Sequence, residues 1–119
     1  MDALTDWVSE GGVSVLNREN QERCYELLNI YGPWPQLMMV IEECSELQKE
    51  CCKMFRERQS NAFVPTQGVV EELVDVIVMC EQLRLMCGLG DEIDELAGKK
   101  LKRAMKRARL QMEAAGKRL

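Results

Sequence analysis

Residues 69–86 read VVEELVDVIVMCEQLRLM, and this stretch decides the fold. Its apolar residues point in nearly every direction around a helix, which is typical of a helix that protein covers on most sides. The valines have some strand propensity, but about 20 residues is too long for an ordinary strand. The sequence therefore predicts a buried helix from about Gly68 to Cys87.

Upstream, a second helix is predicted from Pro33 to about Arg58. Proline is tolerated in the first turn of a helix, so Pro33 and Pro35 mark the start. The apolar residues of this helix follow the i, i+3, i+4, i+7 spacing of one face, and they are Leu37, Val40, Ile41, Cys44, Leu47, Cys51 and Met54. Residues 59–67, which include Pro65, predict the loop between the two helices.

Two further helices complete the predicted domain. One occupies residues 14–31, and the other follows Gly88-Leu89-Gly90, where Asp91 can cap the first turn. Residues 1–13 lack helical periodicity and predict a flexible N-terminal arm, whereas residues 14–119 predict one domain. The expected fold is therefore an all-α four-helix bundle. Its second and third helices have more apolar surface than the other two can cover, so we expect a homo-oligomer.

The composition excludes several kinds of chemistry, because the 119-residue chain contains no histidine. It cannot form a Ser-His-Asp triad, a histidine-ligated zinc site or a Glu-x-x-His di-iron bundle. The six cysteines include no C-x-x-C pair, and we expect them to be reduced and to pack in the core as small hydrophobic side chains. No apolar run reaches the roughly 18 residues of a membrane span, and the acidic N-terminus is unlike a signal peptide, so we expect a cytoplasmic protein.

The net charge of −4 conceals an uneven distribution. Residues 99–119 carry nine basic side chains and one acidic side chain, a net charge of +8, whereas the first 98 residues carry −12. An acidic body with a basic last helix is suited to a polyanionic ligand.

Acidic residues inside the two most apolar helices are the strongest functional signal. Glu42, Glu43 and Glu46 form E-E-x-x-E in one helix, and Glu72 and Asp75 form E-x-x-D in the other. Residues three apart share a helix face, so an antiparallel hairpin can bring the two sets together. Buried carboxylates repel one another unless a cation lies among them, and Mg²⁺ prefers oxygen ligands. The alternative is that these side chains form solvated stripes on amphipathic helices.

The motifs resemble those of a known family. Ile41-Glu42-Glu43-Cys44-Ser45-Glu46-Leu47 and Val70-Glu71-Glu72-Leu73-Val74-Asp75-Val76, with the lead-in Tyr31-Gly32-Pro33-Trp34-Pro35-Gln36-Leu37, resemble the signature of MazG-like all-α nucleoside triphosphate pyrophosphohydrolases. That superfamily also contains dimeric dUTPases and dCTP pyrophosphatases. The resemblance implies a hydrolase that converts a (d)NTP to (d)NMP and pyrophosphate with Mg²⁺, or alternatively Mn²⁺. It also implies a homodimer or a dimer of dimers.

The resemblance further implies roles for individual residues. The implied metal ligands are Glu43, Glu46, Glu72 and Asp75. Glu42 would orient or deprotonate the attacking water. The implied triphosphate contacts are Lys100 and Arg103, and Gln36 of the lead-in is a further substrate contact. Trp34 is a candidate to stack on the base, and the alternative is that it packs at the start of its helix. The family often has K-L-x-x-N in its last helix, and here Ala104 replaces the asparagine, which affects base or sugar recognition.

A second hypothesis is a non-catalytic helical module that binds nucleotides or nucleic acid, or regulates a partner, with the same fold. Nine basic residues near the C-terminus are enough for contacts to a phosphate backbone. This hypothesis does not explain Asp75 within an apolar helix. We therefore expect a nucleoside triphosphate as the ligand, and neither nucleic acid nor a membrane as a partner.

Overall fold

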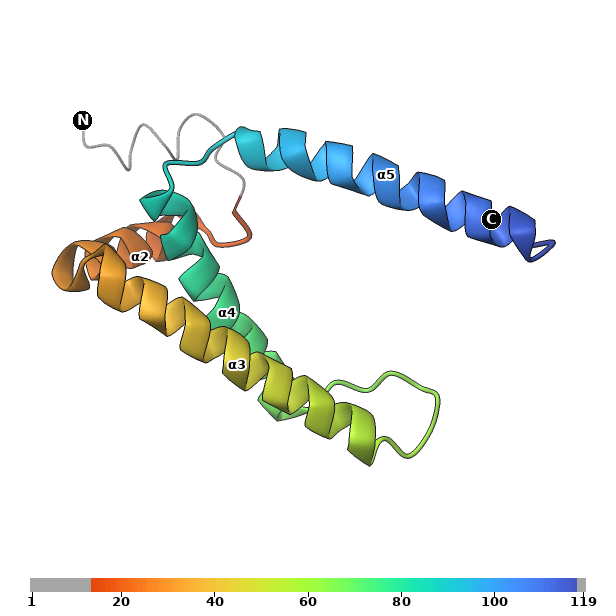
Figure 1. Cartoon of the computed structure of the whole chain (residues 1–119). Helices are drawn as coiled ribbons and strands as arrows, with labels where there is room; N and C mark the ends of the chain where they lie inside the picture. The colour runs from red at the N-terminus through yellow and green to blue at the C-terminus, as the bar shows by residue number, and fades with distance from the viewer. Residues whose placement is uncertain (1–13, 118–119) are drawn as a thin grey trace.

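The computed structural model describes residues 14–117, and these residues are all-α, with no strand among them (Figure 1). The four helices are α2 Arg18–Tyr31, α3 Pro33–Glu57, α4 Gln67–Met86 and α5 Glu92–Ala114. The all-α prediction is confirmed for this part of the chain, and the helix bounds lie close to those predicted. The predicted N-terminal arm, residues 1–13, lies outside the described residues.

Local side-chain chemistry explains where the helices begin and end. Asn17 caps α2, because its side chain accepts a hydrogen bond from the backbone N–H three residues along the chain. Gly32 ends α2 with a φ of 83°, a conformation that favours glycine. The predicted cap of α5 is wrong, because Asp91 makes no capping hydrogen bond with its side chain. Instead, Glu92 accepts a hydrogen bond from the backbone N–H of Gly90 at 2.8 Å.

Three of the helices pack together, and the hairpin of α3 and α4 makes the main contact. Two buried glutamines join these helices, since Gln36 Nε2 donates a hydrogen bond to Gln82 Oε1 at 2.7 Å. Gln82 is only 1% exposed. The shorter α2 packs mainly on α4 and buries Cys24 there. The core of a single chain is therefore small and includes polar side chains.

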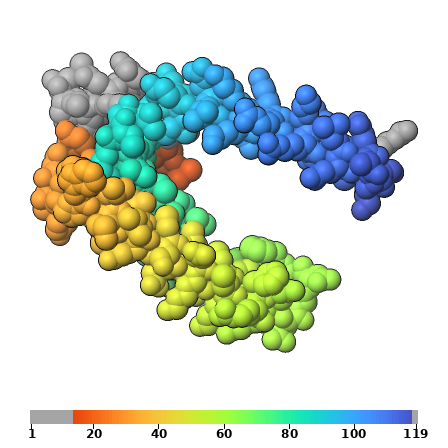
Figure 2. Space-filling view, viewed as in Figure 1, coloured from red at the N-terminus to blue at the C-terminus, as the bar shows by residue number. Residues whose placement is uncertain are grey.

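The helix α5 packs against none of the other described helices. It extends from the end of α4 as an arm, and the space-filling view shows a wide opening between this arm and the hairpin (Figures 1 and 2). Arg84, which forms a buried ion pair with Glu81, donates a hydrogen bond to the Leu89 carbonyl at 2.8 Å and so holds the turn that directs α5 away. The predicted four-helix bundle is therefore not closed within the described part of one chain.

A single chain also leaves much of α4 uncovered. Leu73 is 45% exposed and Val74 is 50% exposed, although both lie in the most apolar helix. The Cα radius of gyration is 18.1 Å, whereas a compact chain of this length has about 13.5 Å. The prediction that protein covers α4 on most sides is thus wrong for one chain, because its one long partner, α3, covers one side and α2 covers part of another.

The cysteines follow the same pattern. All six lie within the described residues and are free thiols. Only Cys24 is buried, so the prediction that they pack in the core is wrong for the other five in a single chain. Although Cys80 is exposed, partial loss of solvation raises the pKa of its thiol, and the neighbouring Cys44 raises it further. Cys44 and Cys80 therefore lie on the same side of the α3–α4 hairpin.

Candidate metal centre

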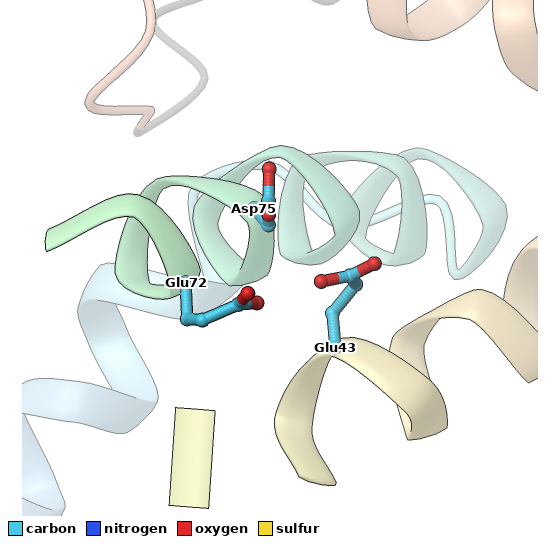
Figure 3. Close-up of side chains that lie close together, drawn as sticks. All are labelled: Glu43, Glu72 and Asp75. Atoms are coloured by element: carbon cyan, nitrogen blue, oxygen red, sulfur yellow. The ribbon is translucent and has the colours of Figure 1, made fainter. Parts of the chain in front are cut away.

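Three carboxylates from two helices meet in the groove between α3 and α4. Glu43 projects from α3, and Glu72 and Asp75 project from α4 (Figure 3). One oxygen from each of the three side chains lies within 4.8 Å of the other two. The three-residue spacing places Glu72 and Asp75 on neighbouring positions of one face of α4, and the hairpin brings Glu43 opposite them. The structure therefore brings together three of the four residues that the motifs implied as metal ligands.

Glu43 and Glu72 are both half-buried, and Asp75 is exposed. The Oε2 atom of Glu72 is buried and has no hydrogen-bond partner among the described residues. Partial burial raises the pKa of the Glu72 carboxyl above its usual range. A hydrogen bond with Glu43 raises this pKa further, and so do the negative charges of Glu43, Asp75 and Glu46. Either a proton or a cation would relieve the repulsion among these carboxylates.

The donor set fits a hard divalent cation. All three groups offer carboxylate oxygens, which Mg²⁺ and Ca²⁺ prefer, and no described histidine or cysteine belongs to the cluster. In an octahedral Mg²⁺ site with bonds of about 2.1 Å, adjacent ligand oxygens lie about 3.0 Å apart and opposite ones about 4.2 Å apart. The three oxygens, which lie within 4.8 Å of one another, would move closer together to ligate one ion. Mg²⁺ also retains water molecules, which leaves positions for a substrate.

Asp75 and Glu46 differ from the expectation. The sequence placed Asp75 among apolar residues and so predicted that it is buried, but Asp75 is exposed and Glu72 instead carries the buried oxygen. The reason is that only α3 and α2 pack on α4 in the described part of one chain, so part of the α4 surface stays open. Glu46 is also exposed and is not one of the three grouped residues, although its charge acts on Glu72. Glu42 is exposed on α3, next to Glu43 in the chain.

The four expected substrate contacts lie on α3 and α5, and none of them belongs to the acidic cluster. Lys100 and Arg103 are exposed on α5, which packs against none of the other described helices. Trp34 is exposed in the first turn of α3. Gln36 is buried and donates its hydrogen bond to Gln82, so its side chain supports the hairpin in this chain. A single chain does not bring these four residues to the carboxylates.

Glu50 is a carboxylate that the motifs do not include, and the structure places it against α4. Glu50 is half-buried, and its carboxylate lies so close to Gly68 that a side-chain carbon there would collide with it. Glu50 lies seven residues after Glu43, which places it on the same face of α3 two turns further along. This spacing is the signal that could have identified it. Gly68 thus permits the close approach of the Glu50 side chain to α4.

Comparison of the chain with known protein families, with curated proteins and with solved structures finds no match. Among the described helices, none combines the length and the apolar composition needed to span a bilayer.

Proposed function

We propose that this chain is a Mg²⁺-dependent nucleoside triphosphate pyrophosphohydrolase. The observation that carries the proposal is the cluster of Glu43, Glu72 and Asp75, with a buried Glu72 oxygen that lacks a partner. The E-E-x-x-E and E-x-x-D motifs supply the family resemblance, and the meeting of Glu43 with Glu72 and Asp75 across the hairpin supports it. Without histidine, acid–base or metal chemistry would fall to carboxylates, lysines, cysteines or the backbone, and the clustered carboxylates favour the first of these.

The proposed chemistry uses charge and position. When bound, Mg²⁺ would neutralise phosphate oxygens and lower the pKa of a coordinated water. Glu43, Glu72 and Asp75 would hold the ion between the two helices. Glu46 lies within electrostatic reach of Glu72 and would complete the ligand set by turning toward it. Glu42 would orient the water that attacks the α-phosphorus, and pyrophosphate would leave.

We also propose that the functional unit is a homodimer or a dimer of dimers. The chain exposes about 9,194 Å² to solvent, whereas a compact monomer of 13.7 kDa exposes about 6,600 Å². Val70, Leu73 and Val74 of α4 and Ile41 of α3 are large apolar side chains that remain exposed. Burial of such a face against a second copy would remove it from water. In that assembly Lys100 and Arg103 of another chain could reach the acidic cluster.

Pyrophosphate release from a panel of (d)NTPs, with and without Mg²⁺, tests the proposed activity. We expect Mg²⁺-dependent turnover in the wild type and its loss in Asp75→Asn. Glu71→Gln is the matched control, because Glu71 is exposed next to Glu72 and is not one of the grouped carboxylates. Full activity in Asp75→Asn would refute the proposed site, and no turnover with any nucleotide would refute the enzyme.

One observation favours a second candidate function, a non-catalytic module that binds polyanions through α5. The helix presents Lys100, Lys102 and Arg103 to solvent, and no described residue of α5 is buried. Salt-dependent binding of single-stranded or double-stranded DNA, unaffected by Asp75→Asn and without any nucleotide turnover, would support this module. The acidic cluster has no role in it, and for that reason we prefer the enzyme.

A further inference from the structure

A cavity at the far end of the α3–α4 hairpin has no role in the chemistry described so far. It has a volume of about 530 Å³, within the range of small-molecule sites, and it lies under the loop that joins the two helices. Its apolar lining includes Met54, Phe55 and Phe63. None of the three carboxylates of the acidic cluster lines it.

We propose that this cavity is the subsite for the nucleobase of the (d)NTP whose phosphates bind at the acidic cluster. The proposal rests on the proposed function, which it deepens by assigning the base-binding residues. Two aromatic rings, Phe55 from α3 and Phe63 from the loop, supply faces on which a planar base can stack. Gln59 and Asn61 of the same lining carry amide groups that can donate and accept hydrogen bonds at the edge of a base.

The position of the cavity relative to the cluster supports this assignment. On α4, Val69 lines the cavity and lies three residues before Glu72, which is about 4.5 Å along the helix axis on a neighbouring part of the same face. On α3, Cys51 lines the cavity and lies eight residues after Glu43, which is about 12 Å along the axis. The carboxylates and the cavity therefore lie along the same two helices, one turn apart on α4 and about two turns apart on α3.

The exposure of the aromatic rings also needs an explanation. Phe63 is 82% exposed and Phe55 is 66% exposed, and Val64 beside them is exposed as well. Three large apolar side chains around one concave surface are costly to leave in water unless a ligand or another chain covers them. The Arg58 guanidinium carbon lies 4.0 Å from the centroid of the Phe55 ring, so one planar group already stacks on this ring. A stacked base offers a similar planar, polarisable surface.

The assignment differs from the expectation that Trp34 stacks on the base. Trp34 lies in the first turn of α3, nine residues before Glu43 and at the opposite end of the helix from the cavity. The two candidates therefore lie on opposite sides of the acidic cluster along α3. Substitution of each in turn distinguishes them.

The experiment measures KM and kcat for the best (d)NTP in Phe63→Ala, Trp34→Ala and a control, Ile30→Ala, whose side chain is exposed on α2. We expect Phe63→Ala to raise KM about five-fold or more, in line with the loss of one base–aromatic stack, with kcat little changed. Inorganic tripolyphosphate, which has no base, should inhibit the wild type and Phe63→Ala equally. An unchanged KM in Phe63→Ala, or a rise only in Trp34→Ala, would overturn the proposal.

A binding measurement separates this proposal from the proposed function. In NMR titrations without Mg²⁺, we expect at least one deoxynucleoside monophosphate to shift the ring signals of Phe55 and Phe63. If that shift occurs but no triphosphate is hydrolysed, the base subsite stands and the enzyme is refuted. If no deoxynucleoside monophosphate shifts these rings, the subsite is refuted whatever the activity. If Phe63→Ala weakens self-association and leaves nucleotide binding intact, the cavity is a subunit contact and the proposal fails.

Discussion

Removal of one carboxylate from the acidic cluster should weaken the stabilisation of the fold by Mg²⁺. In the wild type, Mg²⁺ at about one hundred times its dissociation constant would stabilise the folded state by about 2.7 kcal/mol, provided that the unfolded chain does not bind it. For a domain of this size, that corresponds to a rise in Tm of about 10 °C. If the three clustered oxygens ligate one ion, the loss of one of them should weaken Mg²⁺ binding directly.

Asp75→Asn is the variant of choice, because Asp75 is exposed and its replacement leaves the packing of the hairpin unchanged. If the metal binds about tenfold more weakly, the same Mg²⁺ concentration supplies only about 1.4 kcal/mol, and the rise in Tm falls to about 5 °C. Without metal, the variant should be at least as stable as the wild type, since one of three mutually repelling charges has been removed.

Differential scanning calorimetry in EDTA and in MgCl₂, at matched ionic strength, measures both effects. NaCl at the same ionic strength shows how much of the shift is general screening, and Glu71→Gln shows the effect of losing a charge next to the cluster. Equal Mg²⁺-induced shifts in Asp75→Asn and the wild type would show that Asp75 is not a ligand. Absence of any shift in the wild type would remove the metal centre altogether.

Three further predictions concern the groups around this site. Because the pKa of Glu72 is raised in the folded state, the folded chain binds this proton more tightly than the unfolded chain does. The metal-free protein should therefore lose stability as the pH rises from about 4.5 through the raised pKa. Urea denaturation in EDTA at several pH values should show this loss, and Glu72→Gln should reduce it. Gln82→Leu should lower the free energy of unfolding, measured with urea, by about 1–3 kcal/mol, because it leaves the buried Gln36 amide without its partner. The double variant with Gln36→Leu should recover part of that loss. Equal stability of Gln82→Leu and the wild type would contradict the hydrogen bond. Leu73→Glu should shift sedimentation equilibrium toward monomer without loss of helix content, and an unchanged molecular mass would place the subunit contact elsewhere.

Much of the fold could be predicted because local signals coincide with helix boundaries. Pro33 opens α3, Gly32 separates it from α2, and the periodic apolar residues fix the length of α3. The three-residue spacing of Glu72 and Asp75 also predicted that they lie on one face of α4, and the hairpin predicted that Glu43 lies opposite. These inferences depend on geometry that one helix or one hairpin determines by itself.

The burial of individual carboxylates could not be predicted in this way. A residue between apolar neighbours in sequence is not necessarily enclosed, because alternate positions on a helix face in different directions. Asp75 is exposed, whereas Glu72, three residues earlier, has a buried side-chain oxygen. The lateral position of a side chain within a groove depends on the crossing of two helices, which the sequence of either one does not specify.

The path of α5 and the apolar face of α4 have one physical explanation. An apolar pattern specifies that a surface is to be covered, but it does not specify which chain covers it. In α4 that pattern includes Leu73 and Val74, and in α5 it includes Leu101 and Met105, and all four side chains are exposed in a single chain. Both helices are long, about 30 Å and about 34 Å, so each presents a strip rather than an isolated residue. Neither strip covers the other within the chain, because the turn held by Arg84 carries α5 away from the hairpin. In the homodimer proposed above, the basic α5 of each chain would lie on the acidic hairpin of the other, so that two chains would cover both apolar strips at once.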